Sequence, residues 1–277
     1  LLSSGMDAIA EIAHKYQIPV SWALNSRFIR SLGQKTSEWH EKYSDQIVLM
    51  LNIEQFFPDS DKSEQRIYAE QIVQMRKNIR EHIESEKRKF SEMLPWAEIN
   101  VAGAIQKERV LVQILQEFGF KGLWGYRWKR ESGNHDYGCP FGYFYPSLES
   151  HNVPGEPSSR IVGVPFANHE FLISKNSQSI AHQSHLKSPI INRKESIERY
   201  SVNAGWNRWL GYVEQIHANQ MAKLNSEELQ SLDEYFRWLK EKTEWQFMSI
   251  NEAVSEYRLS FGRTEPTSIF LQNDKDQ

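Results

Sequence analysis

The segment DQIVLMLN (45–52) carries an unbroken apolar run, and this feature restricts the possible folds most. A strand with one solvent-exposed face alternates apolar and polar residues. A strand of a parallel sheet is covered on both faces, and its sequence is continuously apolar. PVSWALN (19–25) is a second β-rich run, and the apolar spacing from Phe28 to Tyr43 between the two is typical of a helix. The order predicts a strand, a helix and a parallel strand.

The same alternation continues along the chain. Further strands are predicted for EINVAGAI (98–105), FKGLWGYRW (120–128), IVGVPFA (161–167), RWLGYVEQIHA (208–218) and EWQFMSI (244–250). Helices are predicted near Gly5–Tyr16, over Lys62–Phe90 and 107–119, and after the capping signals Asn225 with Glu228 and Ser249 with Glu252. Recurring strand–helix units predict an α/β fold whose functional residues lie at the carboxyl ends of its parallel strands.

Residues 129–160 interrupt this order. They are rich in Gly, Pro, Ser and Asn but also carry aromatic residues, which predicts a long functional loop rather than a linker. Beyond it, only a helical piece near Glu195–Tyr200 is indicated before regularity returns. We therefore expect one domain over residues 1–277 with an insertion at about 129–205.

Composition excludes several classes of protein. The formal net charge of -3 and a pI near 6.4 show no basic excess, so nucleic acid is not an expected partner. No apolar run approaches the roughly 20 residues that span a bilayer. Cys139 is the single cysteine, which excludes an intramolecular disulfide.

Because the sequence starts without Met and runs straight into a helix pattern, we expect an incomplete or processed N-terminus. Localisation stays open between secreted and cytoplasmic, and the oligomeric state is unknown.

The order of these segments resembles the polysaccharide deacetylase superfamily, the NodB homology domain. The resemblance covers most of the chain outside residues 129–205 and lies in HKYQIPVSWAL, DQIVLML, AGAIQKERVLVQILQEFGFKGLWGYRW, WLGYVEQIHANQ and WQFMSINEAV. It implies a distorted (β/α)7 barrel of the glycoside hydrolase/deacetylase type, whose first strand would precede Leu1. Active members remove acetyl groups from carbohydrate with a divalent metal, and related barrels include glycoside hydrolases that act through carboxylates.

The family's metal-binding motifs are not found in this sequence. Its first motif, an Asp pair, should precede the helix at Gly5–Tyr16, so it is either missing or truncated together with a first strand that would restore it. Two metal-binding histidines are expected after Ile47–Leu51, but Asn52 and Glu54 stand there without a histidine. The third motif falls at Ala102–Ile105, which has none of its polar groups. The resemblance therefore implies a divergent member, for which we expect no metal ligands and no cofactor.

His217 is the residue that still matches a motif. The family ends a strand on Leu-x-His, where its histidine acts as a general acid, and this chain has Gln215-Ile216-His217. An imidazole titrates near neutrality, so His217 is predicted to act as an acid/base group or substrate donor. A hydrogen-bonded structural histidine is an equally supported alternative. For Glu214, three residues earlier and on the opposite face of an ideal strand, we expect a structural role.

Carboxylates are the remaining catalytic candidates. Glu54 follows the second predicted strand, where a carboxylate can reach a pocket, although a surface turn acid is the alternative. Asp136 and Glu170 are candidates for a second acid. Together such a pair would act in the manner of a glycosidase, with the carboxyl groups roughly 5 to 10 Å apart.

Aromatic and polar residues are predicted to bind the substrate. Aromatic faces stack on sugars and Arg binds hydroxyl or carboxylate groups, so we expect a glycan cleft, although core packing is the alternative for the rings. The candidates are Trp124, Tyr126, Arg127, Trp128, His135, Tyr143, Tyr145 and His169. His182 and His185 have a metal-like spacing but lack a third ligand, so we predict no zinc there.

Two classes of function follow from these residues. The first is a metal-independent hydrolase acting on a glycan through carboxylates. The second is a non-catalytic carbohydrate-binding relative, a pseudoenzyme. Two carboxylates facing one another across a pocket would distinguish the enzyme from the binding protein.

Overall fold

The computed structural model describes residues 2–56, 69–104, 109–127, 142–147, 154–155, 160–166, 194, 198, 211, 213–242 and 245–261. The chain divides into two compact units. The sheet unit comprises Ser21–Phe166 with Ser249–Gln277, and the helical unit comprises Leu1–Val20 with Ala167–Met248.

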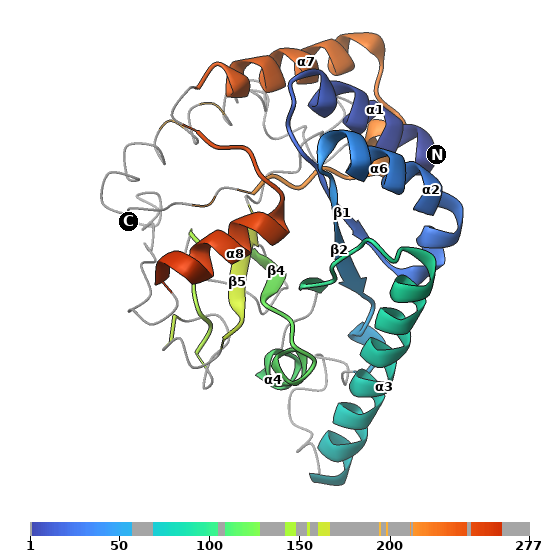
Figure 1. Ribbon diagram of the computed structural model, residues 1–277, viewed down its shortest axis with the longest axis vertical. Helices are drawn as coiled ribbons and strands as arrows, with labels where there is room; N and C mark the ends of the chain where they lie inside the picture. The colour runs from blue at the N-terminus through green and yellow to red at the C-terminus, as the bar shows by residue number, and fades with distance from the viewer. Residues whose placement is uncertain are drawn as a thin grey trace, which may run out of the picture. The chain divides into compact units, whose positions relative to one another are not determined.

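The sheet unit is built on parallel strands. They are β1 (Ser21–Leu24), β2 (Gln46–Leu51), β3 (Val101–Ala104), β4 (Gly122–Arg127) and β5 (Val162–Phe166). All pair in parallel in the order β1-β2-β3-β4-β5. Figure 1 labels β1, β2, β4 and β5. The predicted α/β fold is confirmed, and so are the five strands predicted up to residue 167. Because the strands are parallel, their carboxyl ends lie at one edge of the sheet, here named the carboxyl edge.

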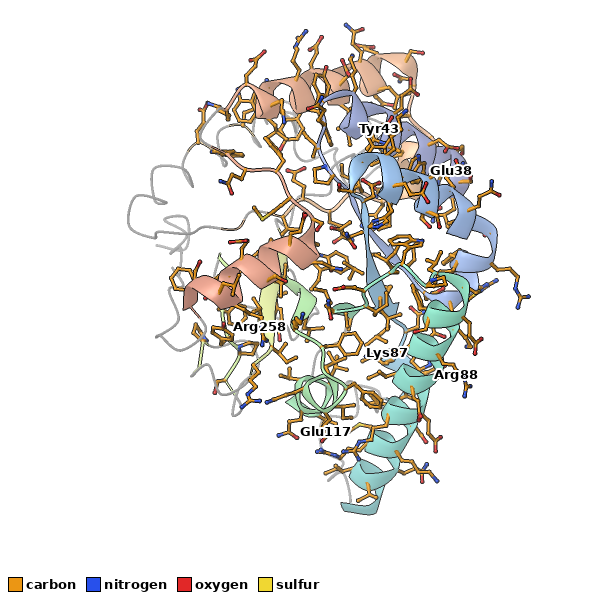
Figure 2. All side chains as sticks on the ribbon, viewed as in Figure 1. Glu38, Tyr43, Lys87, Arg88, Glu117 and Arg258 are labelled. Atoms are coloured by element: carbon orange, nitrogen blue, oxygen red, sulfur yellow. The ribbon has the colours of Figure 1, made fainter. Side chains whose placement is uncertain are left out.

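Helices connect and cover these strands. They are α2 (Ser26–Tyr43), α3 (Ala69–Met93), α4 (Arg109–Glu117) and α8 (Ile250–Phe261), with a 3-10 turn η1 (Glu54–Phe56). Lys87 reaches from α3 toward α4 (Figure 2), where its Nζ donates to the Phe118 carbonyl at 3.0 Å and lies 4.8 Å from the Phe120 ring. Burial lowers the pKa of Lys87. This contact satisfies a carbonyl beyond the end of α4.

The apolar run of β2 is explained by coverage on both faces. Val48, Leu49 and Leu51 are 1% exposed or less. One face of the sheet is covered by α8, because a methyl group placed on Gly122 of β4 would lie 2.9 Å from Val254 Cγ2. The start of α8 is fixed by Asn251, which donates to the carbonyls of Glu98 at 3.1 Å and Ile47 at 3.4 Å. Burial on two faces is what requires unbroken apolar sequence in this strand.

The helical unit contains α1 (Leu2–Lys15), α6 (Ala218–Met221) and α7 (Ser226–Lys240). The end of α1 is joined to α7, since Lys15 Nζ lies 2.9 Å from both Asp233 oxygens and the Tyr16 hydroxyl donates to Asp233 at 3.0 Å. Burial alone would raise the pKa of Asp233, but these two partners outweigh it and lower that pKa. The predicted capping box of α7 is confirmed by Glu228 N to Asn225 Oδ1 at 2.9 Å and Asn225 N to Glu228 Oε2 at 3.0 Å.

Two predicted strands differ from the structure. Within 208–218 the described residues before Ala218 form no strand, and His217 occupies the N-cap position of α6. Within 244–250 the described residues also lack strand structure, and Ser249 caps α8, with its amide and hydroxyl donating to Glu252 at 2.8 and 2.9 Å. Alternating apolar and polar residues are compatible with an extended segment, but a strand also requires a neighbouring strand to pair with.

The burial of α3 changes along its length. Its first turns are solvated, with Ile72 37% exposed, whereas Ile79, Ile83 and Phe90 further along are buried. Among the described ranges, no helix is both long and apolar enough to cross a lipid bilayer.

Glu86 stands on the buried stripe of α3, where its carboxylate fixes the start of α2. It accepts from the Ser26 amide at 2.8 Å, from the Ser26 hydroxyl at 2.6 Å and from Lys89 Nζ at 3.1 Å. Burial by itself would raise the pKa of Glu86, but the Ser26 and Lys89 hydrogen bonds outweigh it, so the pKa is lowered. The carboxylate is therefore ionised and satisfied at neutral pH.

Replacing Glu86 tests this contact. Glu86→Gln removes the charge that Ser26 and Lys89 pair with, so we expect the free energy of unfolding to fall by about 1–3 kcal/mol at neutral pH. Because the folded pKa lies below the ordinary value of 4.5, the contribution is present above that value and is lost as the pH falls through the folded pKa. Urea unfolding of both proteins at neutral and acidic pH measures the difference. The exposed Glu84→Gln on the same helix is the control, and an equal loss in both variants would contradict the assignment.

Candidate functional site

The carboxyl ends of β1 and β2 place polar residues at the carboxyl edge. After β1, the Asn25 side chain caps α2 by accepting from the Arg27 amide at 3.2 Å. After β2, Asn52 is exposed and Glu54 opens η1. This turn is held against α3, since the ring centroids of Phe56 and His82 lie 5.6 Å apart in an edge arrangement. The backbone thus brings Glu54 to the carboxyl edge, and its catalytic role stays a prediction because its side chain lies outside the described atoms.

A bulge changes the direction of β4 near its carboxyl end. Trp124 pairs with Val164, yet Tyr126 pairs with the next residue, Pro165, so one residue of β4 is extra. That residue is Gly125, whose φ of 114° is a conformation that residues with a side chain rarely adopt. The bulge moves Tyr126 to the face opposite Trp124, which is the reverse of what simple alternation would give.

Trp124 is almost buried, at 8% exposed. Its indole lies over Gly103 of β3, where a methyl group would be 2.5 Å from the ring atom Cε3. The same methyl position lies 3.4 Å from Met50 Sδ of β2. The absence of a side chain at Gly103 therefore makes room for the indole.

Tyr126 is also a core residue. It is 0% exposed, and its ring centroid lies 5.1 Å from that of Phe144 in an edge arrangement. Phe144 joins the edge of the sheet through an antiparallel pairing with Gly163 of β5, with N···O distances of 3.2 and 2.7 Å. For Trp124 and Tyr126 the structure thus favours the core-packing alternative.

Tyr143 and Tyr145 lie on either side of Phe144 in sequence and pack toward α8. They are 3% and 2% exposed, and their ring centroids lie 5.9 and 5.5 Å from that of Tyr257. Burial raises the pKa of both phenols, and the charge of Arg258 opposes this effect at Tyr145. Residues 142–146 of the predicted loop are therefore packed into the core. A substrate role for the two tyrosines stays a prediction that their burial does not favour.

In the helical unit, His217 is exposed on a segment held by several hydrogen bonds. Its carbonyl accepts from the amides of Gln220 at 2.9 Å and Met221 at 3.1 Å. Its Nε2 lies 3.1 Å from Gln215 Nε2. Three residues earlier, the Glu214 carboxylate accepts from the Tyr235 hydroxyl of α7 at 2.8 Å, which supports the structural role expected for Glu214.

The remaining predicted site residues lie outside the residues that the structure describes. They are Trp128, His135, Asp136, His169, Glu170, His182 and His185, together with the side chain of Arg127 at the end of β4. Glu54, Asp136 and Glu170 therefore remain candidates for a carboxylate pair on sequence grounds.

The donor groups at the carboxyl edge do not fit the metal that the family uses. After β2 stand the Asn52 amide and Glu54, and Val101–Ala104 of β3 has no polar side chain. Throughout the described ranges, no three His, Cys, Asp or Glu side chains gather as metal ligands would. A site of one carboxylate and two imidazoles cannot be built from these described residues.

Sequence reasoning missed Gln215 as a partner of His217. A signal was present, because residues two apart in an extended segment project to the same side. Glu214, by contrast, accepts a hydrogen bond from Tyr235 of α7.

Comparison with known proteins identifies relatives through structure alone. No family model matches the sequence, and no curated protein matches it. A solved structure assigned as a glycoside hydrolase/deacetylase, from Parabacteroides distasonis, is 15% identical with a TM-score of 0.70, covering 95% of this chain and 65% of that chain.

Two further solved structures are similar. A structure assigned as a polysaccharide deacetylase, from Mycobacterium smegmatis, is 9% identical with a TM-score of 0.61, covering 98% of this chain and 82% of that chain. An allantoinase is 9% identical with a TM-score of 0.60, covering 94% of this chain and 74% of that chain. Likenesses at these identities establish the fold and not the activity. The resemblance seen in the sequence is thereby confirmed at the level of the fold: the chain has the α/β fold of these solved structures.

Proposed function

We propose that the chain is a carbohydrate-active hydrolase that acts on a glycan without a metal. The observation that carries the proposal is the deacetylase-like fold combined with Glu54 at the carboxyl end of β2, in the place of the family's metal-binding histidines. In parallel α/β folds the carboxyl ends of strands are where ligands bind. A carboxylate at that place favours acid/base chemistry of the glycosidase kind.

The proposed roles follow the chemistry of glycoside cleavage. Glu54 and a second acid, Asp136 or Glu170, would take the two carboxyl roles of a glycosidase. One would protonate the glycosidic oxygen of the leaving group, and the other would activate water or attack the sugar. His217 would donate a proton or hydrogen bond to a substrate oxygen. Arg127 and Trp128 at the end of β4, with His135 and His169, would bind sugar hydroxyls and ring faces.

The backbone that carries His217 is fitted closely against α1, which supports a role that requires positioning. Gly5 of α1 approaches α6 so closely that a methyl group on it would overlap the carbonyl oxygen of Ala218. Ala218 follows His217 directly, so α1 sets the position of the histidine backbone.

A non-catalytic glycan-binding protein is the second candidate. It is favoured by the replacement of the family's ligand positions with Asn52 on one strand and with apolar residues on β3. Such a protein would bind a glycan without turning it over. Binding and turnover, measured on the same glycans, separate the two functions.

The first prediction for this site concerns activity. In assays of acetyl release and of glycosidic cleavage over a glycan panel, Glu54→Gln and His217→Ala should each lower kcat/KM by about 10²–10⁴-fold, the range for loss of an acid/base group. Glu84→Gln and Asn219→Ala make matched changes at exposed positions of α3 and α6 and should retain activity.

Each outcome of this assay has a definite meaning. Unchanged turnover in both Glu54→Gln and His217→Ala would remove the assigned residues. Tight glycan binding by the wild-type chain, with neither acetyl release nor cleavage on any substrate, would establish the binding protein instead.

The second prediction concerns Gly5. Gly5→Ala places a methyl group into the Ala218 carbonyl, so α1 and α6 must separate, and we expect a loss of about 1–3 kcal/mol in the free energy of unfolding, as for overpacked sites. Glu11→Ala, an exposed change on the same helix, should be nearly neutral. Chemical denaturation measures both variants, and a neutral Gly5→Ala would show that the close approach does not hold in solution.

A further inference from the structure

We propose that Gln215 is a positioning residue that fixes the proton of neutral His217 on Nδ1 and leaves that N–H as the group offered to a ligand. The catalytic consequence rests on the proposed function, whereas the position of the proton can be tested without any activity. The ligand group that meets neutral His217 would then be a hydrogen-bond acceptor, such as a hydroxyl or carbonyl oxygen of a glycan.

The side-chain nitrogens of Gln215 and His217 face one another. Gln215 Nε2 and His217 Nε2 are 3.1 Å apart, within hydrogen-bond distance. An amide nitrogen carries two hydrogens and accepts none, so in this pair it must be the donor. The imidazole Nε2 is then the acceptor. A neutral imidazole has one acceptor nitrogen and one N–H, which places the hydrogen of His217 on Nδ1.

The backbone holds the two side chains on one side of the segment. His217 has φ −88° and ψ 115°, an extended conformation, and the 3.1 Å approach of its ring to the Gln215 amide places both side chains on one side of the segment. The segment is fixed before Gln215 by the hydrogen bond from Tyr235 to Glu214. It is fixed after it by the α6 amides of Gln220 and Met221, which donate to the His217 carbonyl. The amide–imidazole pair therefore does not depend on a flexible chain.

The pairing also defines what happens when His217 gains or loses a proton. In the neutral state the amide N–H binds Nε2, and Nδ1–H is directed to other partners. When both ring nitrogens carry a hydrogen, Nε2 has no lone pair left to accept with, so the hydrogen bond from the Gln215 amide N–H is lost.

The test is a measurement of the imidazole proton in the full chain. Two-bond ¹H–¹⁵N correlation spectra at alkaline pH, where imidazole is neutral, distinguish Nδ1–H from Nε2–H, and His217→Ala identifies the signals of His217. Wild type should show Nδ1–H. Gln215→Met keeps the length of the side chain but removes the donor, so the hydrogen should move toward Nε2, the form that an unconstrained histidine prefers. Gln230→Met, the same change at an exposed position of α7, should leave the spectrum of His217 unaltered.

The possible results are distinct. Nε2–H in wild type, or an unchanged tautomer in Gln215→Met, overturns the proposal. If the chain turns over a glycan, Gln215→Met should also lower kcat/KM by about tenfold, a loss of about 1.4 kcal/mol of transition-state stabilisation, with no change in the free energy of unfolding. A third result separates the two proposals. If wild type shows Nδ1–H and Gln215→Met shifts the hydrogen toward Nε2, the inference about Gln215 stands. If the same chain turns over no glycan, the proposed hydrolase activity fails.

Discussion

Parallel pairing of the strands β1 to β5 is the constraint on which the sheet unit depends. Parallel neighbours cannot be joined by a tight turn, so each must be followed by a crossover, and the helices α2, α3 and α4 occupy these crossovers. The crossovers cover the sheet and require unbroken apolar sequence in its central strands. The same pairing collects every strand end at the carboxyl edge, where residues far apart in sequence become neighbours. Glu54 reaches that edge only because β2 is parallel to β1 and β3.

Much of the fold could be predicted because it follows from local signals. The apolar run of β2 requires a strand covered on two faces, and the Asn225 and Ser249 capping signals act within one turn of helix. Gly119 adopts φ 77° after α4, as a residue that ends a helix does. Each of these features is decided by side chains within a few residues of one another.

The errors have a common origin in contacts between distant segments. The alternation in 208–218 is real, but no sequence pattern says whether a partner strand lies beside it. Tyr143 and Tyr145 lie in the predicted loop and in no helix or strand, but the pairing of Phe144 with Gly163 draws their segment to the sheet. Glu86 is one of many charged residues on α3. Its partner, Ser26, is separated from it by 60 residues, although a charge within the stripe of Ile79, Ile83 and Phe90 was a visible signal.

The described residues at the carboxyl edge differ from the pattern of the superfamily that the sequence resembles. Asn52 and Glu54 stand after β2, where that pattern has histidines, and β3 offers no polar side chain. His217 keeps its place in the sequence pattern and is supported by Gln215, an uncharged partner that does not itself compete for the proton. These differences are the basis of the proposal that the chain hydrolyses or binds a glycan without a metal.

The location of a bound glycan is the most direct test of the proposed site at the carboxyl edge. A crystal structure of the full chain with an oligosaccharide selected from a binding screen would show where the sugar lies. The account predicts that the sugar contacts the carboxyl edge, with the Glu54 carboxylate within hydrogen-bond distance of one of its oxygens. A sugar bound at the opposite edge, near the amino ends of β2 and β3, or no binding by any glycan tested, would contradict it.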